Sequence, residues 1–354
     1  MVVGPEPSVS TRTVEHEEQS SALPVDPAEG AKAIEGRSLG QIAWSRLKRD
    51  RVAMAGGVVV ILLILIAVFS VRPFGGIIAL LGDPSNDPHA PGTVGWLGPP
   101  PNDWHADQID ATLGGLPIHK FGGISAKYLL GVQPVTGRDV FSQIVYGAQI
   151  SLLVAFLATL LAVLIGVTAG IVAGYFGGWV DSLISRTMDL FLAFPLLLFA
   201  IALVAVLPNG NTVRIVILVF IIGGFSWPYI GRIVRGQTLS LREREFVEAA
   251  RSIGARSPRI LFRELLPNLA APILVYATLI IPTNILFEAA LSFLGVGVQS
   301  PTPSWGALLS DAVEYYEFDP TYMLVPGLAI FITVLAFNLF GDGLRDALDP
   351  KGSR

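Results

Sequence analysis

Six long apolar stretches divide the 354-residue chain, and polar segments separate them. The stretches lie near residues 52–71, 150–173, 188–208, 213–230, 272–295 and 323–343. A helix of about 20 apolar residues crosses the roughly 30 Å hydrocarbon core of a bilayer, so each stretch is long enough to span it. Only Pro208-Asn209-Gly210-Asn211 separates the third from the fourth, a sequence typical of a tight turn between antiparallel helices. The pattern predicts an all-α membrane protein with six transmembrane helices.

The segment between the fourth and fifth stretches, residues 231–271, carries a different helical pattern. Apolar side chains recur at helical spacing over residues 245–253 and again over 260–265, with charged residues on the opposite face. Gly254 lies between the two halves, and glycine inside a helix costs about 1 kcal/mol relative to alanine. We therefore expect two helices joined by a turn at Gly254, a shape suited to binding by another protein.

Composition agrees with a membrane protein, and the basic residues orient it. Hydrophobic residues make up 52% of the chain and charged residues 15%, compared with about 25% charged residues in soluble domains. Because lysine and arginine concentrate in cytoplasmic loops, we expect both termini and the 231–271 loop in the cytoplasm. Residues 296–322 contain no basic side chain. The orienting residues are Arg46, Lys48, Arg49, Arg51, Arg232, Arg235, Arg242, Arg244, Arg251, Arg256, Arg259 and Arg263.

The other segments flank or connect the spans. Residues 1–37 are rich in Glu, Pro, Ser and Ala, which predicts a disordered cytoplasmic tail. Residues 38–71 are expected to form a helix on the membrane surface followed by the first transmembrane helix. Residues 72–149 are expected to form an extracytoplasmic loop that caps the outer face, and 150–350 the membrane core. The apolar face of the surface helix contains Leu39, Ile42, Ala43 and Leu47.

The sequence offers little support for an enzyme. A phosphate-binding loop of the Walker A type needs a lysine followed by Ser or Thr, and no lysine here has that neighbour, so this chain is not expected to hydrolyse ATP. No catalytic residue is identified. His89, His105 and His119 share the external loop, but their spacing matches no metal-ligand pattern, which favours solvated histidines over a metal site. The lysines are Lys32, Lys48, Lys120, Lys127 and Lys351.

Small and polar residues within the spans are candidates for packing or function. Gly166, Gly170 and Gly174 repeat every fourth residue, which predicts a helix-packing face, with a pore lining as the alternative. Asn284 and Glu288 lie one turn apart in the fifth span. Because ionisable residues at membrane depth are functional candidates by default, we take this pair as a candidate for the substrate pathway.

At the start of the third span, Arg186 and Asp189 are spaced for an ion pair within one helix. A structural pair near the membrane interface is the expected role.

The 231–271 loop can now be compared with a known family. Glu248-Ala249-Ala250, followed after three residues by Gly254 and then by Leu266-Pro267, resembles the EAA motif of permease subunits of bacterial ABC importers. Four other blocks resemble the C-type permease subunit of dipeptide, oligopeptide or nickel importers. These blocks are Gly137-Arg138-Asp139-Val140, Trp227 to Arg235, Glu288 to Gln299 with Pro303-Ser304-Trp305-Gly306, and Asn338 to Pro350.

Three departures from the family pattern stand out. The family usually has Leu-Gly-Thr-Asp shortly before Gly-Arg-Asp, whereas here the chain reads Leu-Gly-Val-Gln over residues 130–133. The 72–124 segment is longer than usual, which suggests a contact particular to this lineage. Glu264 stands where the EAA motif has Ile.

The resemblance implies the type I ABC importer permease fold and a cytoplasmic-membrane location. Its implied partners are a second homologous permease subunit, two ATPase subunits that bind ATP and Mg, an extracytoplasmic peptide-binding protein, and membrane lipid. It implies no cofactor in this chain and no nucleic acid. Residues implied to couple the spans to an ATPase are Glu248, Ala249, Ala250, Gly254 and Pro267.

The substrate remains open between di- or oligopeptides and nickel. A less favoured alternative is a secondary transporter driven by an ion gradient through Glu288, and a third is a membrane scaffold without transport activity.

Overall fold

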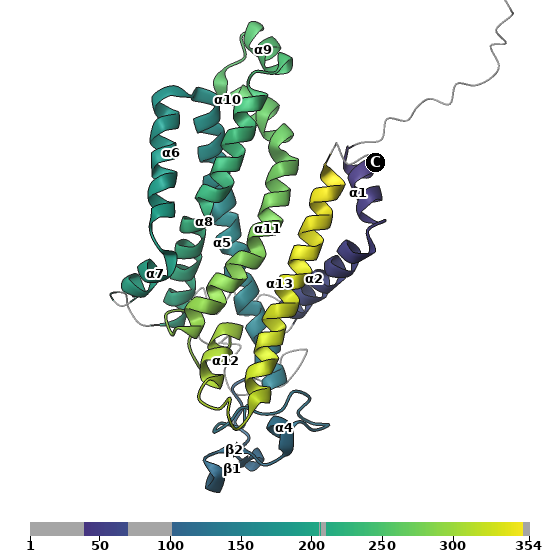
Figure 1. Ribbon diagram of the computed structural model, residues 1–354, viewed down its shortest axis with the longest axis vertical. Coiled ribbons are helices and arrows are strands. Elements are labelled where there is room, and N and C mark those ends of the chain that lie inside the picture. Colours follow the sequence, from purple (N-terminus) through teal and green to yellow (C-terminus); the bar gives the residue numbers. More distant parts are fainter. Residues whose placement is uncertain (1–38, 70–100, 205, 207–209, 350–354) are drawn as a thin grey trace, which may run out of the picture. The chain divides into compact units, whose positions relative to one another are not determined.

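The computed structural model describes residues 39–69, 101–204, 206 and 210–349, all within one compact unit, Leu39–Arg354. The predicted tail at 1–37 and the 72–100 part of the external loop lie outside the described residues, and so do Pro208 and Asn209 of the predicted turn. Figure 1 shows long helices running side by side, with α9 beyond one end and the β1–β2 hairpin beyond the other.

Five helices in the described ranges are long and apolar enough to cross a membrane, and one bent helix pair brings the number to six. This agrees with the six spans predicted. The single helices are α2 (Arg51–Phe69), α5 (Val140–Phe176), α8 (Asn211–Leu241), α11 (Leu266–Phe293) and α13 (Pro320–Leu348). The bent pair is α6 (Gly178–Ala193) and α7 (Leu196–Val204).

The third span differs from its prediction. It begins at Gly178, not near 188, and α6 and α7 meet at an angle of 76°. The break falls at Phe194 and Pro195: proline has no N–H for the helix and disfavours helical geometry in the preceding residue. Phe194 accordingly has extended backbone angles, φ −84° and ψ 129°. The hydrophobic pattern hides the break because the apolar run continues through it.

Helix α5 begins at Val140, ten residues before the predicted start of the second span. Asp139 caps it: the carboxylate accepts hydrogen bonds from the backbone N–H groups of Phe141 and Ser142 at 3.2 and 3.1 Å. Such capping satisfies backbone donors that have no partner in the first turn. The helix packs against α2, α6, α8 and α11, and the largest fully buried side chain, Trp305, contacts it from α12 (Trp305–Ala312).

The described part of the predicted external loop forms a small module at one end of α5 and α13. It contains η2 (Ala106–Gln108), β1 (Ile109–Asp110), η3 (Ala111–Leu113), β2 (Leu116–Pro117) and α4 (Lys120–Gly123). β1 and β2 pair antiparallel, and α4 contacts α13. Residues 101–139 therefore pack onto the ends of two spans.

Helix α1 (Leu39–Leu47) differs in part from the surface helix predicted. Ala43 and Leu47 of its apolar face are buried against Ala347 of α13. This part of the apolar face contacts protein and not lipid, because the end of α13 lies beside it.

Candidate functional site

The polar loop between the fourth and fifth spans folds into short helical segments, of which α9 lies beyond the ends of the long helices (Figure 1). They are α9 (Glu245–Ser252), α10 (Ser257–Arg259) and the π-helical segment η4 (Ile260–Leu265), which continues into α11. The expected turn at Gly254 is present. Gly254 has φ 79°, a left-handed conformation that glycine adopts without steric cost, and this conformation ends α9.

One face of α9 is fixed to the subunit and the other is free. Val247 and Ala250 are buried in a cluster with Ile260, Leu265 and residues of α5 and α8. Glu248 and Ala249 are exposed. Ala250, one of the residues expected to couple the spans to an ATPase, contacts its own subunit in this structure, because its position on α9 faces η4.

Beyond α9, the free surface of the loop includes large apolar side chains. Ile253 is 81% exposed and Phe262 66% exposed, while Gly254 and Pro267 are also exposed. Exposed apolar side chains in a polar surface are typical of a protein-binding site. We call the exposed residues Glu248, Ala249, Ile253, Gly254 and Phe262 the α9 surface.

Arginine side chains connect the α9 surface to the membrane helices. The guanidinium of Arg251 lies 5.3 Å from the ring centre of Tyr175 near the end of α5. Arg242 donates a hydrogen bond to the carbonyl oxygen of Gly174 at 3.0 Å. Both contacts join the loop to the same end of α5, one from α9 and one from the end of α8.

Ion pairs join α6 to α8, and they replace the pair expected within α6. Asp189 accepts a hydrogen bond from Arg232 at 2.6 Å, and no pair with Arg186 is found in the described residues. Asp181 pairs with Arg235. The partners lie 43 and 54 residues apart, so spacing within one helix could not identify them.

The three glycines of the second span lie where α5 meets α8. A Cβ atom at Gly166 would come within 2.7 Å of the carbonyl oxygen of Trp227, and one at Gly170 within 2.7 Å of the carbonyl oxygen of Gly231. At Gly174 the distance to the Cβ of Thr238 would be 2.6 Å. The backbones approach so closely that only glycine fits, which is the packing expected of this repeat.

Asn284 of α11 is fully buried and bonded to two other helices. Its side-chain nitrogen donates to the hydroxyl of Thr159 on α5 at 2.9 Å. Its side-chain oxygen accepts from the hydroxyl of Ser226 on α8 at 3.0 Å. The amide thus joins three spans inside the subunit.

Glu288, one turn further along α11, is also fully buried. Its carboxyl group accepts a hydrogen bond from the Ser292 hydroxyl at 2.8 Å, and the hydroxyls of Ser151 and Ser304 lie beside it. Ser304 caps α12 and Ser151 accepts from the backbone N–H of Trp305 at 3.2 Å. Glu288 therefore lies where α5, α11 and α12 meet.

The burial of Asn284 and Glu288 changes their interpretation. Both were candidates for the substrate pathway, but neither side chain has exposed surface in this structure. The amide of Asn284 is bonded to two neighbouring helices, whereas Oε1 of Glu288 accepts from Ser292 of its own helix and its Oε2 is buried without a hydrogen-bond partner among the described residues. We accordingly place these two residues in the helix contacts and not on an open surface.

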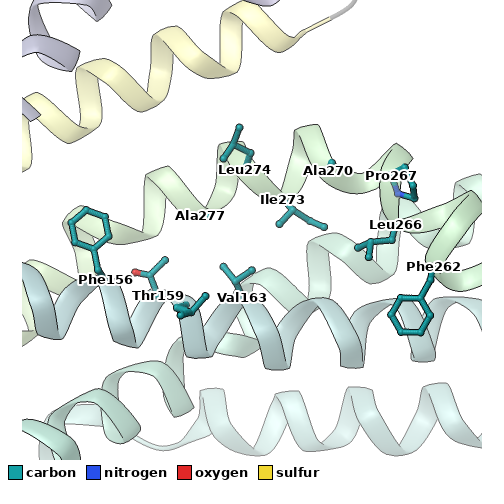
Figure 2. A pocket seen from close by; sticks show the side chains of 11 residues that line it. Phe156, Thr159, Val163, Phe262, Leu266, Pro267, Ala270, Ile273, Leu274 and Ala277 are labelled. Atoms are coloured by element: carbon teal, nitrogen blue, oxygen red, sulfur yellow. The ribbon is translucent and has the colours of Figure 1, made fainter. Parts of the chain in front are cut away.

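A groove of about 550 Å³ lies between α5 and the segment formed by η4 and α11 (Figure 2). Its walls are apolar except for Thr159, whose hydroxyl is already bonded to Asn284, so the groove has no group that would recognise a charged peptide end. Pro267, one of the proposed coupling residues, lies in this wall. The lining residues are Phe156, Thr159, Leu160, Val163, Phe262, Leu266, Pro267, Ala270, Ile273, Leu274 and Ala277.

The Gly-Arg-Asp segment before α5 forms a polar cluster at the opposite end of the helices. Arg138 lies 5.8 Å from the ring centre of Trp104 and donates to the Ser300 hydroxyl at 3.4 Å. Burial raises the pKa of the nearby Asp311 carboxyl, and Arg138 partly offsets that effect. Gln133, at the place where the family usually has Asp, approaches Asp311 at 3.5 Å. The contact of Asp311 with this cluster could not be predicted from sequence spacing, because Asp311 is 173 residues from Arg138 (311 − 138).

Comparison with known proteins identifies the family. Residues 166–354 match the model described as "Binding-protein-dependent transport system inner membrane component". Residues 38–91 match the N-terminal transmembrane domain of oligopeptide transport permease C. The first match alone covers more than half of the 354 residues.

Individual relatives are similar over most of their length. The dipeptide transport system permease protein DppC of Alkalihalophilus pseudofirmus is 44% identical over 66% of this chain and 76% of its own. The glutathione transport system permease protein GsiD of Shigella flexneri is 43% identical over 87% of this chain and 89% of its own.

A chain in a solved structure of the MetNI methionine ABC transporter aligns with this protein over 58% of this chain and 96% of that chain, with 20% sequence identity and a TM-score of 0.46. The family assignment rests on the sequence matches and not on this similarity. The chain belongs to the binding-protein-dependent transport system inner membrane components, as a multi-pass protein of the inner membrane.

Proposed function

We propose that this chain is a transmembrane subunit of an ATP-driven importer for dipeptides or short oligopeptides. The observation that carries the proposal is the α9 surface, which is exposed on one side and fixed on the other to α5 and α8. The names of the relatives, a dipeptide and a glutathione permease, support a peptide as the substrate.

In this proposal ATP and Mg bind to two separate ATPase subunits, since no lysine of this chain fits a phosphate-binding loop. The α9 surface lies in the cytoplasm with both termini and contacts one ATPase. Glu248 pairs with a basic residue of that partner, and Ala249 permits close approach. A second homologous permease subunit and an extracytoplasmic peptide-binding protein complete the complex.

The proposed coupling is mechanical. ATP-dependent closure of the ATPase pair displaces α9, and the contacts of Arg251 with Tyr175 and of Arg242 with Gly174 pass the displacement to α5. The close packing of α5 on α8 makes the two helices move as one body.

Two alternatives lead to different observations. A nickel importer of the same family would show uptake of nickel and not of peptides, although neither relative compared above bears a nickel name. A secondary transporter driven through Glu288 would need no ATPase, but that carboxyl group is enclosed between helices in this structure.

The test is transport by the purified complex in proteoliposomes, with a peptide panel and nickel as substrates. Glu248→Lys and Gly254→Asp are expected to abolish ATP-dependent uptake, the first by charge reversal at the contact and the second by strain at φ 79°. Asp346→Lys, at an exposed position near the end of α13, is the matched charge-reversal control and should transport normally.

Normal uptake by both loop variants would refute the coupling role, while uptake without ATPase subunits would refute the importer class.

A further inference from the structure

The corner between α1 and α2 exposes aromatic and basic side chains where a membrane span begins. Trp44 is 53% exposed, and the Nζ of Lys48 lies 5.1 Å from the centre of its indole ring. Arg49 and Arg51 follow and are also exposed. We call these four residues the corner cluster. Because α2 continues from Arg51 as a 19-residue apolar helix, the cluster lies at the level where lipid headgroups meet the hydrocarbon.

The other face of α1 fixes the orientation of the cluster. Ala43 and Leu47 are buried against α13, so α1 cannot rotate about its axis without exposing them. Arg46 is engaged elsewhere, because its guanidinium donates a hydrogen bond to the carbonyl oxygen of Asp349 at 2.8 Å. The exposed side of α1 is therefore a defined surface of the folded subunit.

The charge of the cluster is not cancelled locally. Asp50 is the only acidic residue between positions 39 and 54. Its Oδ1 atom accepts hydrogen bonds from the backbone N–H groups of Val52 and Ala53 at 2.9 and 3.1 Å, as the cap of α2. Within the described ranges, no ion pair reaches Lys48, Arg49 or Arg51.

We propose that the corner cluster binds the anionic headgroup of a phospholipid in the leaflet where α2 begins. Tryptophan favours the membrane interface because its ring is apolar and its N–H is polar. Lysine and arginine beside a span are attracted to anionic lipids. In the cluster the Lys48 ammonium lies over the indole ring of Trp44, and Arg49 and Arg51 add two exposed cationic groups at the start of α2.

The test uses the full-length protein in phosphatidylcholine nanodiscs that contain a minor fraction of brominated lipid. The brominated lipid is phosphatidylglycerol in one sample and phosphatidylcholine in the other. The difference in fluorescence between the wild-type protein and Trp44→Phe isolates the signal of Trp44. We expect quenching by brominated phosphatidylglycerol to be at least about twofold greater, because each basic side chain adds to the local lipid excess.

The combined variant Lys48→Gln, Arg49→Gln and Arg51→Gln should abolish the preference, and high salt should weaken it in the wild type. Lys127→Gln is the matched control, because the Nζ of Lys127 also lies 5.1 Å over an aromatic ring, that of Tyr128, at the other end of the molecule. The control should keep the full preference. An unchanged thermal midpoint in the triple variant separates loss of lipid from loss of fold.

Equal quenching of Trp44 by the two lipids would overturn the proposal, since it would show interfacial contact without headgroup selection. No quenching by either lipid would overturn it as well. In that case, recovery of quenching after deletion of residues 1–37 would identify the acidic segment around Glu15, Glu17 and Glu18 as the occupant instead.

Discussion

The two halves of α5 contact their neighbours through different kinds of interaction. The half that contains Gly166, Gly170 and Gly174 contacts α8 through backbone atoms that leave no room for a Cβ. The half that contains Ser151 and Thr159 is joined to α11 and α12 by hydrogen bonds of buried polar side chains. The first contact depends on the size of one residue type, and the second on the chemistry of paired groups. A different kind of substitution should therefore destabilise each half.

The largest effect is expected in the glycine half. Gly170→Leu would place atoms against the carbonyl oxygen of Gly231 and the Cβ of Val234, where a Cβ alone already reaches 2.7 and 2.9 Å. Because both contacts are rigid, we expect a loss of about 3 kcal/mol or more, measured as a fall in monodisperse protein and thermal midpoint.

Gly236→Ala in α8 is the control, because nothing lies within 4 Å of a Cβ at that position. It should leave stability unchanged or raise it by about 0.5–1 kcal/mol. Equal damage from both substitutions would contradict the view that close backbone approach holds this half.

A smaller but selective effect is expected at Glu288. Glu288→Leu removes the acceptor that faces Ser151, Ser292 and Ser304, and leaves buried hydroxyls without that partner. We expect a loss of about 2–3 kcal/mol, because unpaired buried polar groups are costly.

Glu288→Gln keeps an acceptor of the same shape and should retain most of the stability. The thermal midpoint of both variants in detergent is the measurement. If Gln is as damaging as Leu, then charge and not hydrogen bonding decides the contact.

The smallest effect is expected at the bond between Asn284 and Thr159. Polar contacts between membrane helices average about 0.6 kcal/mol, so Asn284→Leu and Thr159→Val should each cost on the order of 1 kcal/mol. A double-mutant cycle measures their coupling. A coupling near zero would show that the 2.9 Å bond adds nothing to this half.

The spans, the family and the type I ABC importer permease fold were predictable from the sequence, because long apolar runs and the EAA pattern are local signals. The turn at Gly254 was predictable for the same reason. The break at Pro195 was not, since an apolar run carries no sign of a bend within it.

The candidate site was less predictable because its contacts join distant segments. Ala250 is buried because η4 packs on α9. Asn284 and Glu288 are enclosed because α5 lies beside them. The partner of Asp189 proved to be Arg232 of α8 and not the nearby Arg186. A pattern within one helix reports which face is polar, but not which neighbour will cover it.

The 37 residues of α5 make it much longer than a bilayer requires. At 1.5 Å per residue the helix extends about 55 Å, compared with a hydrocarbon core of roughly 30 Å. Its first turn is capped beside the Arg138 cluster, and its last turns contact Arg242 and Arg251. If a rod of that length tilts by about 5° about its middle, its two ends move by roughly 2 Å in opposite directions. In the proposed coupling, a displacement at the α9 end would therefore also move the end of α5 that is capped beside the Arg138 cluster.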